Sequence, residues 1–337
     1  MTRVSAVVLA HGDEPWLAAC VDSVLRSSGI AVDVVLVDNA YTGDDLDAIA
    51  ARDGVTLVRP PRNLGFSGGC NLGARRATGD VLAFVNADAV VDGDALRRLA
   101  AVACRDDVGI ATASVRLADD PTRLNSGGND IHFLGISWSG GFGESAEAHA
   151  VERDVAGASG AAMTIRREVW DELGGFDDAY FAYYEDAELS LRAWMSGRRV
   201  VYVPDAVVVH RYEFSRNPQK HYLAERNRLL LVVTLFEART LLVLLPALLL
   251  LEIGMVVAAT AGGWLGPKLS GWAWIVRNRR WVAERRRAVQ RSRRRRDREL
   301  VGLFATRVTA ANTPLPPGTG ALNAVLAAYW RIARGLV

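Results

Sequence analysis

The sequence predicts an α/β fold with a mixed, mainly parallel sheet, helices on both faces of the sheet and further C-terminal helices that associate with a membrane. Three observations support this prediction. Over residues 1–115, short β-branched runs alternate with helical stretches, and those runs are apolar throughout. A long uncharged segment then follows in the last third of the chain. Strands that are apolar on both faces are typical of a buried parallel sheet.

The local patterns predict the individual elements. Strands are expected at Val4 to Leu9, Val32 to Val37, Thr56 to Arg59, Val81 to Val85, Gly109 to Val115, Arg199 to Val203 and Ala206 to His210. Helices are expected where apolar residues recur at helical spacing, at Trp16 to Ser27, Gly69 to Ala77, Gly93 to Arg105 and Arg167 to Leu173. Residues 117–152 show no clear period, and we expect a loop-dominated insert there that acts as a lid or flap.

The uncharged segment runs from Thr240 to Gly266, where Glu252 is the only charged residue. About 20 apolar residues span a bilayer, so this segment is long enough. Pro246 and Glu252 are both unfavourable in a lipid-facing helix. Two membrane interpretations therefore stay open, a kinked or re-entrant span and a helix that lies in the interface. A buried core helix is the alternative to membrane contact.

Positive charge is concentrated directly after this segment. Twelve arginines and only two carboxylates lie between Arg277 and Arg298, although the formal net charge of the whole chain is only +2. Tryptophans flank the start of the block, at Trp264, Trp272, Trp274 and Trp281. Interfacial tryptophans beside arginines are expected at a cytoplasmic membrane surface. We therefore predict a location at the cytoplasmic face of the cell membrane and no nucleic-acid partner.

These segments predict three parts of the chain. Residues 1–235 form the catalytic domain, residues 236–300 form apolar and Arg-rich membrane-associating helices, and residues 301–337 form a tail. The tail contains an amphipathic helix, Ala321 to Ile332, that docks onto the body or touches the bilayer. The three cysteines lie far apart, which argues against a disulfide framework. The short N-terminal apolar run is not a signal peptide, so we expect the body to stay in the cytoplasm.

Polar residues follow the ends of the predicted strands. His11, Asp38 and Asp88 each lie just beyond a strand, where open sheets of this kind bind ligands. Asp88 closes an Asn-Ala-Asp triplet and could ligate Mg²⁺ together with substrate phosphates. His210 ends another strand and could add an imidazole ligand. Each has a structural alternative: the triplet as a turn, the histidine as a core residue, and Asp38 as a turn or helix cap.

The run from Phe181 to Arg192 joins aromatic residues to the adjacent carboxylates Glu185 and Asp186 at the start of a helical pattern. The positive end of a helix dipole favours an ionised carboxylate. Such a group beside aromatic walls suits removal of a proton from a hydroxyl nucleophile. A glycine-rich block from Arg62 to Gly73 lets the backbone approach a ligand closely, with a tight helix-capping loop as its alternative. Together these segments indicate a transferase with a metal-diphosphate anchor and a base.

Taken in order, these blocks resemble the family 2 inverting glycosyltransferases of the GT-A (Rossmann-like) fold, most closely their bacterial rhamnosyltransferase-like branch. The likeness covers roughly residues 4–235. The matching pieces are Val7 to Ala10, Val37 to Asn39, Asn63 to Gly73, Val85 to Asp88, Gly157 to Met163, Gly174 to Asp177, Tyr183 to Leu189 with Arg192, Val203 to Ala206, and His210.

The resemblance implies an inverting, metal-dependent hexosyltransferase. The residues that it implies for the nucleotide-sugar donor are Ala10, Glu14, Asp38, Asn63, Gly65, Asn71, Asn86 and Arg192. Asp88 and His210 are implied as ligands of Mg²⁺ or Mn²⁺ on the donor diphosphate. Asp186 is implied as the catalytic base, with Glu185 in support. The metal motif of this family often begins with Asp, and Asn86 takes that place here.

The resemblance and the membrane segment together imply the substrates. The expected donor is dTDP-rhamnose, with UDP-galactofuranose or a UDP-N-acetylhexosamine as alternatives. The expected acceptor is a polyprenyl-diphosphate-linked glycan at the cytoplasmic leaflet, in cell-wall or surface polysaccharide biosynthesis. An inactive membrane scaffold is a further alternative, although Asp38, Asp88 and Asp186 are all present. Homo-oligomerisation stays open.

Overall fold

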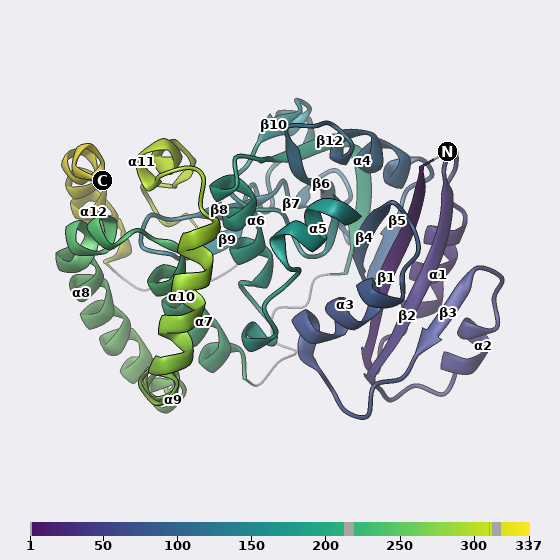
Figure 1. Cartoon of the computed structure of the whole chain (residues 1–337), viewed down its shortest axis with the longest axis horizontal. Coiled ribbons are helices and arrows are strands. Elements are labelled where there is room, and N and C mark those ends of the chain that lie inside the picture. The colour runs from purple at the N-terminus through teal and green to yellow at the C-terminus, as the bar shows by residue number, and fades with distance from the viewer. Residues whose placement is uncertain (1, 212–218, 310, 312–317) are drawn as a thin grey trace.

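The computed structural model describes residues 2–211, 219–309, 311 and 318–337 (Figure 1). Its main sheet has ten strands: β1 (Arg3–Gly12), β2 (Ala31–Tyr41), β3 (Val55–Val58), β4 (Val81–Asn86), β5 (Ala89–Val91), β6 (Val108–Leu117), β7 (Leu124–Ser126), β10 (Arg153–Asp154), β11 (Ala162–Arg166) and β12 (Arg199–His210). The order is β10-β12-β6-β11-β4-β1-β2-β3, with β5 paired to β12 and β7 to β6. Strands β4, β1, β2 and β3 are parallel neighbours, as are β6 and β12, whereas β11 is antiparallel to both β4 and β6. The predicted mixed, mainly parallel sheet is confirmed.

Helices cover both faces of this sheet. Successive side chains of β1 point to opposite faces, so alternate residues of this strand contact different helices. Val4, Ala6 and Val8 join one buried cluster with α1 (Leu17–Leu25), α2 (Leu46–Ala50) and α4 (Ala95–Ala103). Val7 and Leu9 join a second cluster with α3 (Gly65–Arg76), α5 (Arg167–Leu173) and α6 (Glu185–Met195). Because β4, β1, β2 and β3 run parallel between these layers, their carboxyl ends lie together at one end of the sheet.

The insert at residues 117–152 differs from the expected loop-dominated flap. It contains β7, the hairpin of β8 (Asn129–Ile131) and β9 (Ser137–Ser139), and a short 3₁₀ helix, Ala146–His149. Ile131, Phe133 and Leu134 are fully buried in the second cluster. Strands of three residues are too short to show a period in the sequence, which is why they were not expected. Likewise, β12 continues through Pro204 with a register shift where two strands were predicted.

The C-terminal part is helical. Its helices are α7 (Lys220–Leu235), α8 (Ala238–Ala261), α9 (Leu265–Arg277), α10 (Arg279–Ser292), α11 (Asp297–Leu300) and α12 (Thr319–Ala333). The predicted closing helix is present as α12, whose Trp330 stacks on Phe133 with ring centroids 4.5 Å apart. Among the described residues, α8 is the one helix long and apolar enough to cross a membrane.

The arginine block is less solvated than its sequence suggests. Arg285 on α10 pairs with Asp177 at 2.7 Å and with the fully buried Glu188 at 3.0 Å. Arg286 donates to the carbonyl oxygens of Val233 and Phe236. These contacts pack one side of α10 against α7 and the sheet-bearing part of the chain, and Arg293 is likewise buried in an ion pair with Asp297.

Candidate active site

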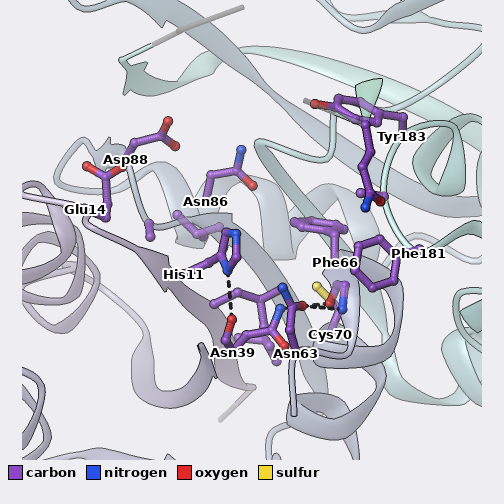
Figure 2. A pocket seen from close by; sticks show the side chains of 17 residues that line it. His11, Glu14, Asn39, Asn63, Phe66, Cys70, Asn86, Asp88, Phe181 and Tyr183 are labelled. Carbon is purple, nitrogen blue, oxygen red and sulfur yellow. Dashed lines mark hydrogen bonds between the residues drawn. The ribbon is translucent and has the colours of Figure 1, made fainter. Parts of the chain in front are cut away.

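A cavity of about 510 Å³ opens at the carboxyl ends of β1, β2 and β4. Figure 2 shows Glu14, Asn86 and Asp88 on one side of it, and Phe66, Phe181 and Tyr183 on the other. Of the residues predicted for donor and metal binding, the lining includes Glu14, Asn63, Gly65, Asn86 and Asp88. The cavity at the ligand-binding edge expected of such a sheet is therefore lined by five of the ten residues predicted for donor and metal binding.

Strand register brings Asp88 and His210 together although they are far apart in the chain. Ala89, the first residue of β5, pairs with His210 at the end of β12. Asp88 precedes Ala89 and consequently lies beside the imidazole, with Asp88 Oδ1 3.0 Å from His210 Nε2. The two side chains are 18% and 8% exposed, so the pair is largely shielded from bulk water.

The hydrogen bonds around His210 fit a divalent cation at this position. His210 Nδ1 lies 3.0 Å from Asn125 Oδ1, and Nε2 lies 3.4 Å from the amide nitrogen of Asn86. Both contacts favour the tautomer that carries its proton on Nδ1 and leaves a lone pair on Nε2. In that tautomer, Nε2 could offer its lone pair to a cation that Asp88 also contacts, whereas with a proton on Nε2 the ring donates to Asp88 Oδ1. No group of three or more His, Cys, Asp or Glu side chains converges in the described part of the chain, and the described residues bring together Asp88 and His210 here.

Asn39 holds the glycine-rich loop against the floor of the cavity. Its Nδ2 donates to the carbonyl of Gly65 (3.0 Å), and its Oδ1 accepts from the N–H of Leu64 (2.8 Å). Gly65 has φ +71°, and a Cβ there would lie 2.4 Å from the carbonyl oxygen of Phe181. Only glycine suits this position, because both its backbone conformation and the close approach exclude a side chain.

The wall opposite Asp88 has an unusual backbone. Phe181, Tyr183 and Tyr184 adopt positive φ values of 63°, 68° and 72°. Such conformations are strained for bulky residues and persist only where the surroundings enforce them. Asn227 of α7 supplies that enforcement, since its Nδ2 lies 2.9, 2.9 and 2.7 Å from the carbonyl oxygens of Tyr180, Ala182 and Tyr183.

The strained wall leads directly into α6, which begins at Glu185 as the sequence predicted. Asp186 in the first turn is partly exposed and accepts three N–H bonds, from Asn129 Nδ2 (2.9 Å), Gly160 N (3.0 Å) and Ala187 N (2.7 Å). Glu185 is buried, and its Oε2 has no partner among the described residues. The two carboxyl groups are therefore in different environments despite being adjacent.

These environments favour different protonation states for Glu185 and Asp186. Burial, and then the charge of Asp186, raise the pKa of Glu185 well above its ordinary value. Burial also raises the pKa of Asp186, but its three N–H donors oppose that shift by stabilising the ionised form. Asp186 is thus the member of the pair suited to be ionised and to accept a proton, whereas Glu185 is suited to be neutral.

The other predicted residues, including Glu185, Asp186 and His210, lie outside the lining of the cavity. Ala10 and Asp38 adjoin the lining residues Leu9, His11 and Asn39, and Asp38 Oδ1 accepts from the N–H of Tyr41 (3.1 Å). Asn71 joins α3 to the segment before the strained wall, by bonds to Phe176 and Asp178. Arg192 forms a buried bidentate ion pair with Glu188 (2.8 and 2.7 Å) and donates to two backbone carbonyls.

Four asparagines shape the site without having been predicted: Asn39, Asn125, Asn129 and Asn227. Asn39 follows Asp38 at the end of a predicted strand, which was the one available signal. Asn125 and Asn129 belong to the insert, and Asn227 belongs to a helix beyond it. Their partners lie from 25 to 85 residues away in the chain, so no local pattern reveals them.

Comparison with known proteins relates these features to a family. Residues 5–174, half of the chain, match the family model described as "Glycosyl transferase family 2". Among curated proteins, N-acetylglucosaminyl-diphospho-decaprenol L-rhamnosyltransferase of Mycobacterium tuberculosis is 41% identical over 75 residues, which cover 22% of this chain and 24% of that protein. The alignment thus spans about a quarter of that relative's length.

Two solved structures share the fold. GalNAc-T7 with UDP, GalNAc and Mn²⁺ matches with a TM-score of 0.59 at 19% identity, over 71% of this chain and 49% of that chain. The mannosyltransferase PcManGT from Pyrobaculum calidifontis, in complex with GDP-Man and Mn²⁺, matches with a TM-score of 0.51 at 18% identity, over 99% of this chain and 86% of that chain. Both neighbours hold Mn²⁺ in their structures.

Proposed function

This chain belongs to glycosyl transferase family 2 and is a glycosyltransferase of the GT-A fold; from that premise we propose that it transfers a sugar, with inversion, from a nucleotide sugar to a hydroxyl of a polyprenyl-diphosphate-linked glycan. One observation carries the proposal. Asp88 lines one side of the cavity and lies 3.0 Å from His210, and Tyr183 of the opposite wall directly precedes the segment that contains Asp186. We infer from this arrangement that a cation-and-diphosphate anchor and a proton acceptor flank the bound substrates.

The proposed chemistry is a single displacement. The acceptor hydroxyl oxygen attacks the anomeric carbon, the bond from that carbon to the diphosphate oxygen breaks, and the hydroxyl proton passes to Asp186 Oδ. Asp88 and His210 would hold a Mg²⁺ or Mn²⁺ ion, which would supply positive charge to the leaving nucleoside diphosphate. Asn129 and Gly160 hold the carboxylate of Asp186 in place through their N–H groups. Attack opposite the leaving group inverts the anomeric carbon.

For the donor we propose dTDP-L-rhamnose, because the mycobacterial relative, over its short alignment, is an L-rhamnosyltransferase. That relative acts on a decaprenyl-diphosphate-linked sugar, which supports a polyprenyl-diphosphate-linked acceptor. A UDP-galactofuranose or UDP-N-acetylhexosamine donor would use the same residues and is the second candidate. We also propose the division into a catalytic domain (1–235), membrane-associating helices (236–300) and a C-terminal tail (301–337), working at the cytoplasmic membrane face.

A panel of nucleotide sugars tests this function. The purified full chain is incubated with each donor and Mn²⁺, and thermal stabilisation and release of the nucleoside diphosphate are measured, with and without lipid-linked acceptor. We expect one donor to stabilise the protein, and only when the metal is present. The Asp88→Ala variant should lose the metal-dependent part of that stabilisation. Equal stabilisation of wild type and Asp88→Ala by donor and Mn²⁺ would remove Asp88 from the metal site.

A further inference from the structure

Helix α8 presents a continuous apolar stripe to the outside. Its exposed large side chains are Leu242, Leu245, Leu249, Leu250, Ile253 and Val257, each 43–73% exposed. They recur at helical spacing along one face, and the opposite face packs inward through Leu244, Ala247, Leu251 and Ala259. A stripe of this size on the surface marks a contact with a membrane or with another protein.

Helix α12 lies beside α8 and adds exposed apolar and basic residues. It packs against α8, where the hydroxyl of Tyr329 donates to the carbonyl of Val243, and both helices lie at the end of the molecule farthest from β3 (Figure 1). The exposed apolar residues of α12 and of the short 3₁₀ helix that follows it (Arg334–Leu336) include Ile332 and Leu336, which alternate with the exposed Arg331 and Arg334. No Asp or Glu occurs from residue 300 to the C-terminus. The surface therefore combines apolar contact area with positive charge, which fits an anionic lipid leaflet.

The inner face of α8 carries a buried group of four charges. Glu252, near the middle of the helix, pairs with Arg228 of α7 and with Lys268 of α9 (2.9 Å), and Lys268 also pairs with Glu225 (2.5 Å). The side chains of Arg228 and Lys268 are 2% and 0% exposed. Because two carboxylates and two cations satisfy one another, this ion cluster (Glu225, Arg228, Glu252, Lys268) fixes α8 to α7 and α9.

The ion cluster limits the orientation that α8 can adopt relative to a bilayer. If α8 crossed the bilayer, Glu252 would lie near the bilayer centre and would take Arg228 of α7 with it. Neighbouring residues on α7 are bound to the active-site wall, since Asn227 contacts Tyr180 and Tyr183. A crossing helix would thus draw charged groups and catalytic machinery into hydrocarbon, which is strongly unfavourable.

We propose that α8 and α12 lie in the plane of an anionic leaflet, with the apolar stripe of α8 inserted from one side and the ion cluster kept on the protein side. The inference rests on the proposed membrane location of the enzyme and specifies its geometry. Docked in this way, the chain holds α7 and the active-site wall that α7 supports at a fixed orientation to the membrane. A lipid-linked acceptor would then reach the cavity from the leaflet on which the protein rests.

Cysteine labelling of the two ends of α8 tests the geometry. In a Cys104→Ser background, which removes the exposed cysteine, Ala238→Cys and Ala261→Cys place a thiol at either exposed end of the helix. Intact spheroplasts and inverted membrane vesicles are treated with a membrane-impermeant maleimide. We expect both thiols to react in inverted vesicles only. Reaction of one end in spheroplasts and the other in inverted vesicles would show a crossing helix and overturn the proposal.

Flotation with vesicles tests the surface itself. The full chain is mixed with vesicles of phosphatidylglycerol and phosphatidylethanolamine, or of phosphatidylcholine alone, and we expect tighter binding to the anionic set. Leu249→Glu with Ile253→Glu should weaken binding by on the order of tenfold or more. Val151→Glu is the matched control, because Val151 is 74% exposed but lies outside these helices; it should bind as wild type does.

Two outcomes would overturn the surface assignment: binding unaffected by the double variant, or a dimer in solution that the double variant dissociates while wild type fails to float. Neither readout requires a sugar donor. Protein that floats and labels as expected but transfers no sugar would therefore leave this inference standing and contradict the proposed function.

Discussion

The two sides of the active-site cavity are built in different ways. On one side, Asp88 and His210 stand at strand ends, and the pairing of β5 with β12 sets their separation. On the other side, Phe181 and Tyr183 lie in left-handed backbone that bonds from α7 maintain. The first side is thus determined by sheet register, and the second by buried polar contacts between distant segments. The position of a side chain at a strand end follows from the pairing of that strand, whereas a strained loop keeps its conformation only through the contacts that hold it.

This difference corresponds to two separate tasks in the proposed reaction, donor binding and proton transfer. The strand-end side offers ligands for a cation and its diphosphate, which is a binding task. The loop side leads to Asp186, the proposed base, which would have to lie at hydrogen-bonding distance from the acceptor hydroxyl. Substitutions on the two sides should consequently separate donor binding from turnover.

The largest effect is expected from Asp186→Asn. This change keeps the shape of the side chain but removes its ability to accept a proton. General bases contribute about 10²- to 10⁴-fold, so kcat should fall within that range while the KM for the donor and the affinity for Mn²⁺ stay near wild type. Steady-state kinetics and calorimetric titration of Mn²⁺ measure both quantities.

Glu185→Gln is the matched comparison for this variant. Because Glu185 is expected to be neutral already, replacing it with the isosteric amide should lower kcat far less than Asp186→Asn does. If Glu185→Gln were the more damaging change, the assignment of the two carboxyl groups would be reversed.

The same contrast explains what the sequence could predict. The apolar runs predicted the strands of the sheet. Residues just beyond strand ends, such as Asp88, could be identified because the end of an apolar run marks the end of a strand. The helix start at Glu185 was also visible locally. The positive φ values at Phe181 and Tyr183 were not, since bulky residues rarely adopt them and their support comes from Asn227, more than 40 residues away. Asn129 was missed because its strand has only three residues.

An intermediate effect is expected from Asn227→Asp. The change is isosteric, yet it replaces the donor Nδ2 with an oxygen that faces three carbonyl oxygens. The strained wall should relax and Asp186 should lose its alignment, so we expect kcat to fall by roughly 10- to 100-fold, as misplacement of a reacting group does. Donor KM should change little, because the strand-end side is untouched. Hydrogen exchange of residues 179–186 should accelerate.

Asn323→Asp is the matched control, because it also removes an asparagine whose amide donates to a backbone carbonyl. Asn323 of α12 also bonds a backbone segment, through Nδ2 to the carbonyl of Val308 (2.9 Å), but it lies outside the cavity lining. Its kcat should stay at the wild-type value. Equal losses in both variants would indicate general destabilisation instead of a specific role for Asn227 in positioning the wall.

The smallest effect is a shift in pH dependence caused by Asn129→Ala. Burial raises the pKa of Asp186, so the acidic limb of kcat/KM should lie above the range of an ordinary aspartate. Asn129 donates to the ionised carboxylate and so lowers that pKa. Removing the donor favours the protonated form, so the pKa of Asp186 should rise and the limb should move to higher pH. Turnover on the alkaline side of the limb should be less affected, since there Asp186 is ionised in both proteins. A limb that stayed in place, or moved to lower pH, would show that the group titrating in the reaction is not the carboxyl that Asn129 contacts.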